Sequence, residues 1–354
     1  MASVESYRRK MEIIFLISAQ RSGSTLLQSM LASHPSVHTE PEPWLLLPLV
    51  YSRRTNGIWT EYDCEFSTDA LEAFLARIDG SALYDECIRS FVETLYARAL
   101  AGGGARYFLD KTPRNFLVID DISRIFPTAK LVFLLRHPIA IFSSMLEGVS
   151  CDWSSMLQDS GYRLDLLAAP NLIAKAVRSI KDPIVVHYED LVRTPERTMQ
   201  ALCARLGLRF DSATLRYDPP PPEAAGDHKS IHRHTTAVAD YVDGWRNGLR
   251  GPGALGFARA YAASLDEDVL DIYRVNKSEL LKEIDSLGRS ASSAKWVRRL
   301  SAWDNTTALS RASITYECAM ERRGFRRAVG SAARKLWSDV AGRKPALKWW
   351  REKA

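Results

Sequence analysis

The sequence predicts an α/β fold, a three-layer sandwich with a central parallel sheet between two layers of helices. Three short segments indicate it, at residues 13–17, 131–135 and 184–188. The first two are unbroken runs of Ile, Leu, Val and Phe, which are typical of strands buried on both faces of a parallel sheet. Each segment is followed by a turn and the start of a helix, the order expected where helices connect parallel strands.

The first strand runs into a loop of small polar residues at 21–25. Its sequence is Arg-Ser-Gly-Ser-Thr, and the spacing of the next apolar residues predicts one face of a helix formed by Leu26, Leu27, Met30 and Leu31. The first turn of a helix has free N–H groups, and the helix dipole is positive at that end. A strand, this loop and a helix together predict an anion-binding site.

The loop differs from the Walker A motif of nucleoside triphosphatases. That motif places Lys directly before its Ser or Thr, whereas here Gly23 is followed by Ser24 and Thr25. The cation stands earlier, at Arg21, and the sequence offers no convincing pair of carboxylates for Mg²⁺. These features favour an anion that is held by backbone N–H groups, hydroxyls and a guanidinium, without a metal.

A second group of elements follows the same pattern. We expect strands at 107–110 and 131–135, a helix over about 114–125, and another helix that begins near Pro138, because Pro suits the first turn of a helix. Arg136 then stands at the carboxyl end of a parallel strand. Ligands bind at that edge in open α/β sheets, so Arg136 is a candidate binding residue.

Taken in order, these motifs resemble those of the sulfotransferases that use 3′-phosphoadenosine-5′-phosphosulfate (PAPS). Residues 21–27 resemble the 5′-phosphosulfate loop of that family, residues 136–144 its 3′-phosphate signature, and residues 188–191 the segment that follows. The phrase Ile-Phe-Pro-Thr-Ala-Lys-Leu-Val-Phe-Leu-Leu-Arg at 125–136 is itself typical of the family. The resemblance covers residues 11–250 and implies a P-loop-like phosphosulfate loop within the predicted fold.

The resemblance also implies the cofactor and its site. PAPS would be the co-substrate and 3′,5′-bisphosphoadenosine (PAP) the product, with in-line, metal-independent transfer of SO₃ to a hydroxyl, less readily to an amine. Catalysis would rest on charge stabilisation by Arg21 and Lys111. The residues implied at the nucleotide are Arg21, Ser22, Gly23, Ser24 and Thr25 at the 5′ end, Arg136 and Ser144 at the 3′-phosphate, Tyr188, and Lys229 and Arg233 in a segment before Trp245 that would close over the nucleotide.

A general base must take the proton of the acceptor. Cytosolic aryl and steroid sulfotransferases carry a His two residues after the counterpart of Lys111, but this chain has Pro113 there. Protein-tyrosine sulfotransferases use a Glu after the helix of the phosphosulfate loop, and Glu42 matches that position best. Glu40, His38 and a His within 228–234 are the alternatives. A carboxylate base needs an apolar environment, which Trp44 and the leucines at 45–47 are placed to supply.

Composition and charge divide the chain into two parts. Its 354 residues and 46% hydrophobic content suit one large catalytic domain, which we place at 1–288. Residues 289–354 form a basic, Trp-rich extension, expected to be helical, with 16 Lys or Arg against 5 Asp or Glu. We expect this extension to pack on the domain or on a second subunit of a homodimer, or to contact an anionic membrane surface peripherally.

The remaining features limit location and partners. Five unclustered cysteines argue against a disulfide framework, and neither a secretory signal nor a membrane span is evident, so we expect a cytoplasmic protein. The acceptor is expected to be a sugar, lipid, natural product or tyrosine peptide with a hydroxyl, and no nucleic-acid partner is expected. Two alternatives remain open: a P-loop-type nucleotide kinase and a non-catalytic nucleotide-binding module.

Overall fold

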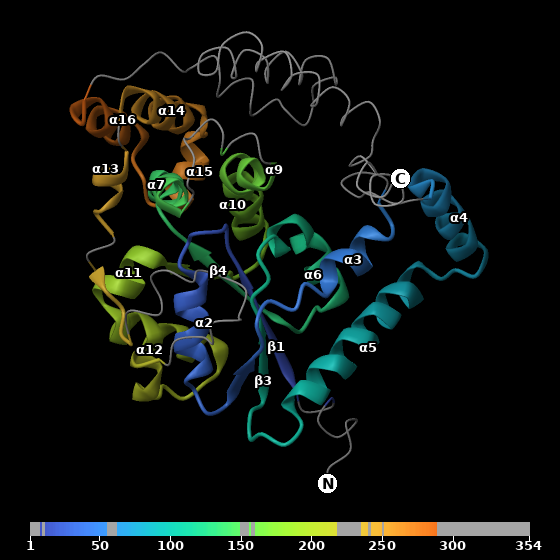
Figure 1. The fold of residues 1–354 in the computed structure, drawn as a ribbon. Coiled ribbons are helices and arrows are strands. Elements are labelled where there is room, and N and C mark those ends of the chain that lie inside the picture. Colours follow the sequence, from blue (N-terminus) through green and yellow to red (C-terminus); the bar gives the residue numbers. More distant parts are fainter. Residues whose placement is uncertain are drawn as a thin grey trace, which may run out of the picture.

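The chain folds around one five-stranded sheet (Figure 1). The computed structural model describes residues 8, 11–54, 62–148, 156, 160–217, 235–239, 242–249 and 251–288. The sheet has the order β2-β3-β1-β4-β5, and all neighbouring strands are parallel. The strands are β1 (Glu12–Ile17), β2 (Val37–Thr39), β3 (Tyr107–Asp110), β4 (Lys130–Leu135) and β5 (Ile184–His187). The predicted α/β fold with a parallel sheet is confirmed.

β2 is the strand that the sequence does not predict. It has three residues, of which only Val37 is buried, so it lacks the apolar run that identifies the other strands. It pairs with β3 at the edge of the sheet, with Thr39 opposite Leu109. This pairing brings the segment after Thr39 beside the segment that follows β3.

Helices follow the strands where the sequence predicts them. β1 leads into α2 (Ser24–Ala32), and β4 leads into α7 (Pro138–Gly148). The helix expected near 114–125 is a 3₁₀ turn, η1 (Asn115–Val118), continued by α6 (Ile119–Ile125). The other helical elements are α3 (Leu46–Tyr51), α4 (Cys64–Arg77), α5 (Ser81–Leu100), α9 (Ser160–Arg163), η2 (Leu164–Ala168), α10 (Ala169–Ser179), α11 (Tyr188–Arg193), α12 (Pro195–Leu206), η3 (Ser212–Leu215), α13 (Trp245–Gly248), α14 (Gly251–Ser264), α15 (Glu267–Ile272) and α16 (Lys277–Ser286).

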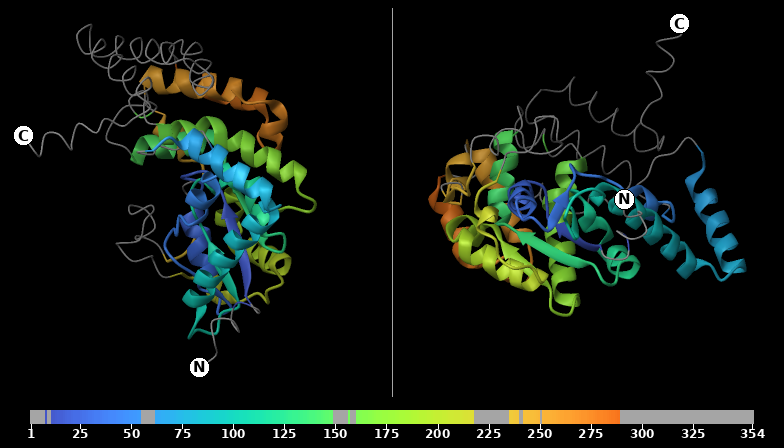
Figure 2. Two further views of the ribbon diagram at one scale, coloured as in Figure 1. Left: turned by 90° about the vertical axis from the view of Figure 1, so that its right-hand side faces the viewer. Right: turned by 90° about the horizontal axis from the view of Figure 1, so that it is seen from below.

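The core lies on both faces of the sheet. Side chains alternate along a strand, so Phe15 and Ile17 of β1 pack with α5, α6, α7 and α10, while Ile14 and Leu16 pack with α2, α11 and α12 on the other face. α14 packs on α7, α15 packs on α10, and α16 packs on α14, so that these three helices lie outside the helical layer next to the sheet (Figure 2). Two helical layers thus enclose the sheet, as expected for a three-layer sandwich.

This topology gathers the ends of the strands at one edge. Because all five strands are parallel, the residues that follow β1, β3, β4 and β5 meet at the carboxyl edge of the sheet. The extension 289–354 lies outside the described residues, so the domain boundary at 288 stays a prediction. Over the described part of the chain, no helix combines the length and the apolar character needed to cross a bilayer.

Candidate active site

The loop after β1 is shaped by two residues with positive φ. Arg21 has φ of 63° and Gly23 has φ of 87°. A Cβ atom on Gly23 would lie 2.4 Å from Cδ2 of Tyr188, so this position needs glycine both for its backbone conformation and for the close approach of the ring. No side chain caps the first turn of α2. Its N–H groups are therefore available to an anion in the loop.

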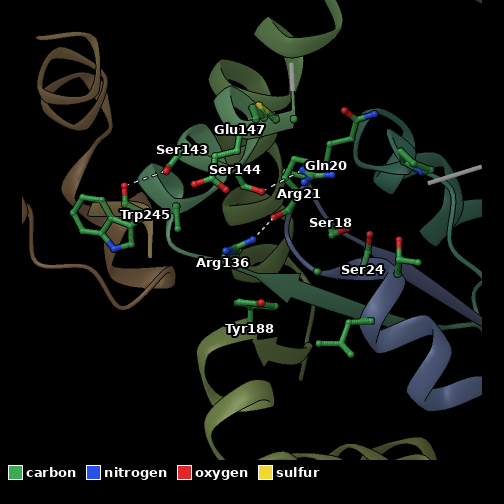
Figure 3. Close-up of a pocket in the computed structure, with 18 of the residues that line it drawn as sticks. Ser18, Gln20, Arg21, Ser24, Arg136, Ser143, Ser144, Glu147, Tyr188 and Trp245 are labelled. Carbon is green, nitrogen blue, oxygen red and sulfur yellow. Dashed lines mark hydrogen bonds between the residues drawn. The ribbon is translucent and has the colours of Figure 1, made fainter. Parts of the chain in front are cut away.

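Arg136 and Ser144 join this loop from β4 and α7. The guanidinium of Arg136 donates to the carbonyl oxygen of Arg21 at 2.8 Å, and its central carbon lies 4.3 Å from the centre of the Tyr188 ring. Nε of Arg21 in turn donates to Oγ of Ser144 at 3.2 Å. Figure 3 shows Arg136 directed at the backbone of Arg21 and the side chain of Arg21 directed at Ser144. Burial lowers the pKa of the Arg136 guanidinium from its ordinary value, against the opposite effects of Tyr188 and Glu189.

These groups line one cavity of about 530 Å³. Its wall includes most of the candidate residues, namely Arg21, Gly23, Ser24, Thr25, Glu42, Lys111, Arg136, Ser144 and Tyr188. Ser22 is buried and does not line the cavity. Lys229, Arg233 and the histidines at 228–234 lie outside the described residues.

Glu42 and Lys111 form an ion pair on the wall of this cavity. Nζ of Lys111 lies 2.5 Å from Oε1 of Glu42, and their side chains are only 3% and 8% exposed. The pair forms because β2 and β3 are neighbours, which brings the segments after the two strands side by side. The second carboxylate oxygen, Oε2, accepts a hydrogen bond from the indole Nε1 of Trp44 at 3.2 Å. Both oxygens of Glu42 therefore have a donor.

Trp44 gives Glu42 a polar neighbour, where the sequence predicts that Trp44 and the leucines at 45–47 form an apolar wall. Trp44 is 40% exposed and turns the polar edge of its indole to Glu42. The backbone at Trp44 has φ of 50°, in the left-handed region. Leu46 is buried in the core, and Leu45 and Leu47 pack against the same cluster.

A hydrogen-bond network holds the backbone at Trp44. The backbone N–H of Trp44 donates to Oγ1 of Thr112 at 3.3 Å, and Thr112 donates to Asp110 at 2.7 Å. Tyr96 of α5 donates to the other oxygen of Asp110 at 2.5 Å. Burial raises the pKa of the Asp110 carboxyl, while these hydrogen bonds act in the opposite direction. The network fixes the loop that carries Glu42 to the end of β3.

The other candidate bases lie elsewhere. Nε2 of His38 lies 3.0 Å from Oε1 of Glu40, and the side chain of Glu40 is half exposed. Neither residue lines the cavity. Among the carboxylate and histidine candidates that the structure describes, Glu42 is thus the one placed at the cavity.

Several residues of the cavity were missed in the sequence. Glu147 lies one turn after Ser144, so the spacing along α7 was a usable signal for it. The hydroxyl of Ser143 donates to the carbonyl oxygen of Trp245 of α13 at 3.0 Å. The ring of Trp245 stacks on that of His137, with the ring centres 5.2 Å apart. Tyr162 and Tyr217 come from segments without any local motif. Across the described residues, no three His, Cys, Asp or Glu side chains cluster in a way that could hold a metal ion.

A comparison with models of protein families identifies the family of this chain. The model described as "Sulfotransferase family" matches residues 13–212, which is more than half of the chain. The chain belongs to the sulfotransferase family. The matched region includes every cavity residue discussed above from Arg21 to Tyr188.

Similar members of the family come from bacteria and animals. Nodulation protein NoeE of Sinorhizobium fredii is 31% identical over 247 residues, which cover 64% of this chain and 55% of that protein. Protein-tyrosine sulfotransferase 1 of Danio rerio is 25% identical over 249 residues, which cover 67% and 65%. The chain thus spans between about half and two thirds of the length of these relatives. The sulfotransferase domain of the Synechococcus PCC 7002 olefin synthase aligns with a TM-score of 0.48 and 24% identity, covering 75% of this chain and 94% of that one.

Proposed function

We propose that this chain transfers the sulfuryl group of PAPS to a hydroxyl of an acceptor, with Glu42 as the general base. The observation that carries the proposal is the placement of the Glu42–Lys111 pair in the same cavity as Arg21 and Arg136. A base and an anion site that share one cavity are what a group transfer from an anionic donor requires. Family membership favours this reaction over the two alternatives, a kinase and a non-catalytic module.

The donors of the cavity fit a nucleotide with negative charge at both ends. The uncapped N-terminus of α2 and the hydroxyls of Ser24 and Thr25 suit a phosphosulfate, with Arg21 as the cation. Arg136 and Ser144 suit a separate phosphate, because a guanidinium and a hydroxyl form charge-assisted hydrogen bonds with phosphate oxygens. PAPS supplies the sulfuryl group when it is bound.

Glu42 and Lys111 perform complementary tasks. The Glu42 carboxylate accepts the proton of the acceptor hydroxyl and must give up Lys111 as a partner when it does so. Lys111 has three N–H donors, and the ion pair uses one of them. The ammonium can therefore stabilise negative charge that develops on oxygen atoms in the cavity. Trp44 keeps the carboxylate oriented through Oε2.

The acceptor is a hydroxyl compound of the sugar, lipid, natural-product or tyrosine-peptide class. The protein-tyrosine sulfotransferases among the relatives favour a phenolic hydroxyl as the first to test. The exposed indole of Trp44, next to Glu42, offers a surface on which an aromatic ring or a sugar ring can pack.

Transfer of labelled sulfate tests the proposal. The purified chain is incubated with ³⁵S-PAPS and a panel of hydroxyl acceptors, with and without EDTA, and products are separated and counted. Label in an acceptor in both conditions supports the proposal. A reaction that needs ATP and Mg²⁺ and ignores PAPS would show that the chain is a kinase. Binding of PAP without any transfer across the panel would favour the non-catalytic module.

A further inference from the structure

The helices α4 and α5 carry two exposed apolar stripes. On α5 the side chains of Ile88, Val92 and Tyr96 are buried, but a second face is open to solvent. The two stripes, called here the hairpin stripes, have four-residue spacing. They consist of Phe66, Ala70, Phe74 and Ile78 along α4 and its C-cap, and Leu83, Cys87, Phe91 and Leu95 along α5. Six of the eight large apolar side chains that are exposed in the described part of the chain belong to these stripes.

α4 has little packing of its own. Of its 14 residues only Thr68 and Leu75 are buried, and Phe66 is 74% exposed. Helices of this length are marginal in water unless an apolar face is packed against something else. Exposed apolar surface of this extent marks an interaction site. The hairpin stripes therefore need an occupant.

The net charge of residues 62–100, which contain α4 and α5 and are called here the hairpin, indicates which kind of partner can bind the stripes. Residues 62–100 contain eight Asp or Glu against three Arg, a net charge of −5. The acidic side chains of Glu65, Asp69, Asp79 and Glu86 are exposed and form no ion pair with the rest of the described chain. A second copy of the hairpin or an anionic membrane would be repelled by this surface. A basic segment with large apolar side chains would be attracted to it.

The chain itself contains such a segment. Residues 289–354 have a net charge of +11 and include the five tryptophans Trp296, Trp303, Trp337, Trp349 and Trp350. A chain of 66 residues can span at most about 220 Å when extended and about 100 Å as one continuous helix, and both lengths exceed the diameter of about 50 Å expected for a compact domain of about 290 residues. Figure 1 places α16, after which this segment begins, and α4 on opposite sides of the molecule. The segment can therefore reach the hairpin stripes.

We propose that residues 289–354 bind the hairpin stripes of their own chain. The tryptophans pack on the exposed Phe and Leu side chains, and the Lys and Arg residues pair with the acidic groups along α4 and α5. The tether favours the intramolecular contact, because a linked segment has an effective concentration in the millimolar range. This proposal is independent of the reaction proposed above.

Zero-length carbodiimide cross-linking of the full chain tests the contact. Equal amounts of ¹⁴N-labelled and ¹⁵N-labelled protein are mixed, cross-linked at low salt, digested and analysed by mass spectrometry. The expected products join lysines of the segment, such as Lys335 and Lys348, to Glu65 or Asp79 within chains of one label. No cross-links between segment and hairpin, or cross-links that mainly join ¹⁴N to ¹⁵N chains, would overturn the proposal.

A charge reversal provides the matched comparison. The double variant Asp69→Lys, Glu86→Lys should lower the cross-linking yield at the unchanged Glu65 and Asp79 about fivefold. Glu196→Lys, an exposed reversal on α12, should leave that yield unchanged. Equal yields in all three proteins would overturn the proposal. So would loss of the intramolecular cross-links when the full chain sediments with vesicles that contain phosphatidylserine.

Discussion

Oε1 of Glu42 and Nζ of Lys111 are 2.5 Å apart, although 69 positions separate the two residues in the sequence. The pairing of β2 with β3 brings them together, and Trp44 and Thr112 hold the loop in place. A buried charge needs its partner, because an unpaired ion in the interior is strongly disfavoured. We therefore expect the loss of either partner to destabilise the fold.

Replacing Glu42 by Gln should remove the base and keep the shape of the loop. We expect kcat for sulfate transfer to fall about 10²- to 10⁴-fold, while PAP binding measured by calorimetry changes little. Glu40→Gln is the matched control, since Glu40 lies two residues away and outside the cavity. Wild-type turnover of Glu42→Gln would assign the base to another residue.

Replacing Lys111 by Met should leave the Glu42 carboxylate buried without its cation. We expect the free energy of unfolding, measured with urea, to fall by about 3–5 kcal/mol. The double variant Lys111→Met, Glu42→Gln should recover at least half of this loss, because it removes the unpaired charge as well. If the second substitution gives no recovery, the two side chains are not coupled in the folded protein.

A comparison of Gly23 with Gly102 distinguishes the need for a positive φ from the need for space next to the backbone. Both have positive φ, but a Cβ atom at Gly102 would meet open space, whereas at Gly23 it would overlap the ring of Tyr188. Gly102→Ala should therefore cost only the backbone penalty of about 1–2 kcal/mol. Gly23→Ala should cost about 1–3 kcal/mol more.

The same pair of variants should differ in nucleotide binding. Gly23→Ala displaces either Tyr188 or the loop, so we expect PAP affinity to fall by about tenfold, that is, by about 1.4 kcal/mol. Gly102→Ala should bind PAP like the wild type. Equal stability and equal affinity for the two variants would contradict the close contact of Gly23 with Tyr188.

His137 should make the fold sensitive to acid. Burial, with the charges of Arg246 and Arg136, lowers the pKa of His137 to about 4. The unfolded chain binds this proton near pH 6.5, but the folded chain does not, so stability is present above pH 6.5 and is lost as the pH falls toward 4.

The variant His137→Phe tests this dependence. It keeps a ring against Trp245, and it removes Nδ1, which is buried and has no hydrogen-bond partner. We expect the free energy of unfolding, measured with urea between pH 7 and pH 4, to depend less steeply on pH in this variant. The difference from the wild type corresponds to about one bound proton. An unchanged slope would mean that His137 is protonated in the folded protein.

The sequence predicts those parts of the site whose chemistry lies in one short segment. The loop at 21–25 and the positions of Arg136 and Ser144 follow from strand and helix patterns, and parallel pairing brings the ends of these strands together. β2 escaped prediction because three residues with one buried side chain carry no periodic signal. The roles of Tyr217 and Trp245 depend on tertiary packing alone.

The environment of Glu42 is another feature that the sequence does not predict. Trp44 follows Glu42 by two residues in the sequence, but in the fold it meets the carboxylate with the N–H of its indole, which is a hydrogen-bond donor. The stripes of α4 and α5 have helical spacing, but the sequence alone does not distinguish an exposed apolar face from a buried one.

The nucleotide assignment can be measured by titrating PAP into the wild type, Arg136→Met and the control Arg124→Ala. Arg136→Met keeps an apolar stem beside Tyr188 but removes the guanidinium. Arg124 lies on α6, where it pairs with Asp85 and Asp121. We expect PAP to bind the wild type and Arg124→Ala equally well and Arg136→Met about 10- to 100-fold more weakly. Equal affinity of all three proteins for PAP, or no binding to any of them, would contradict a PAPS site in this cavity.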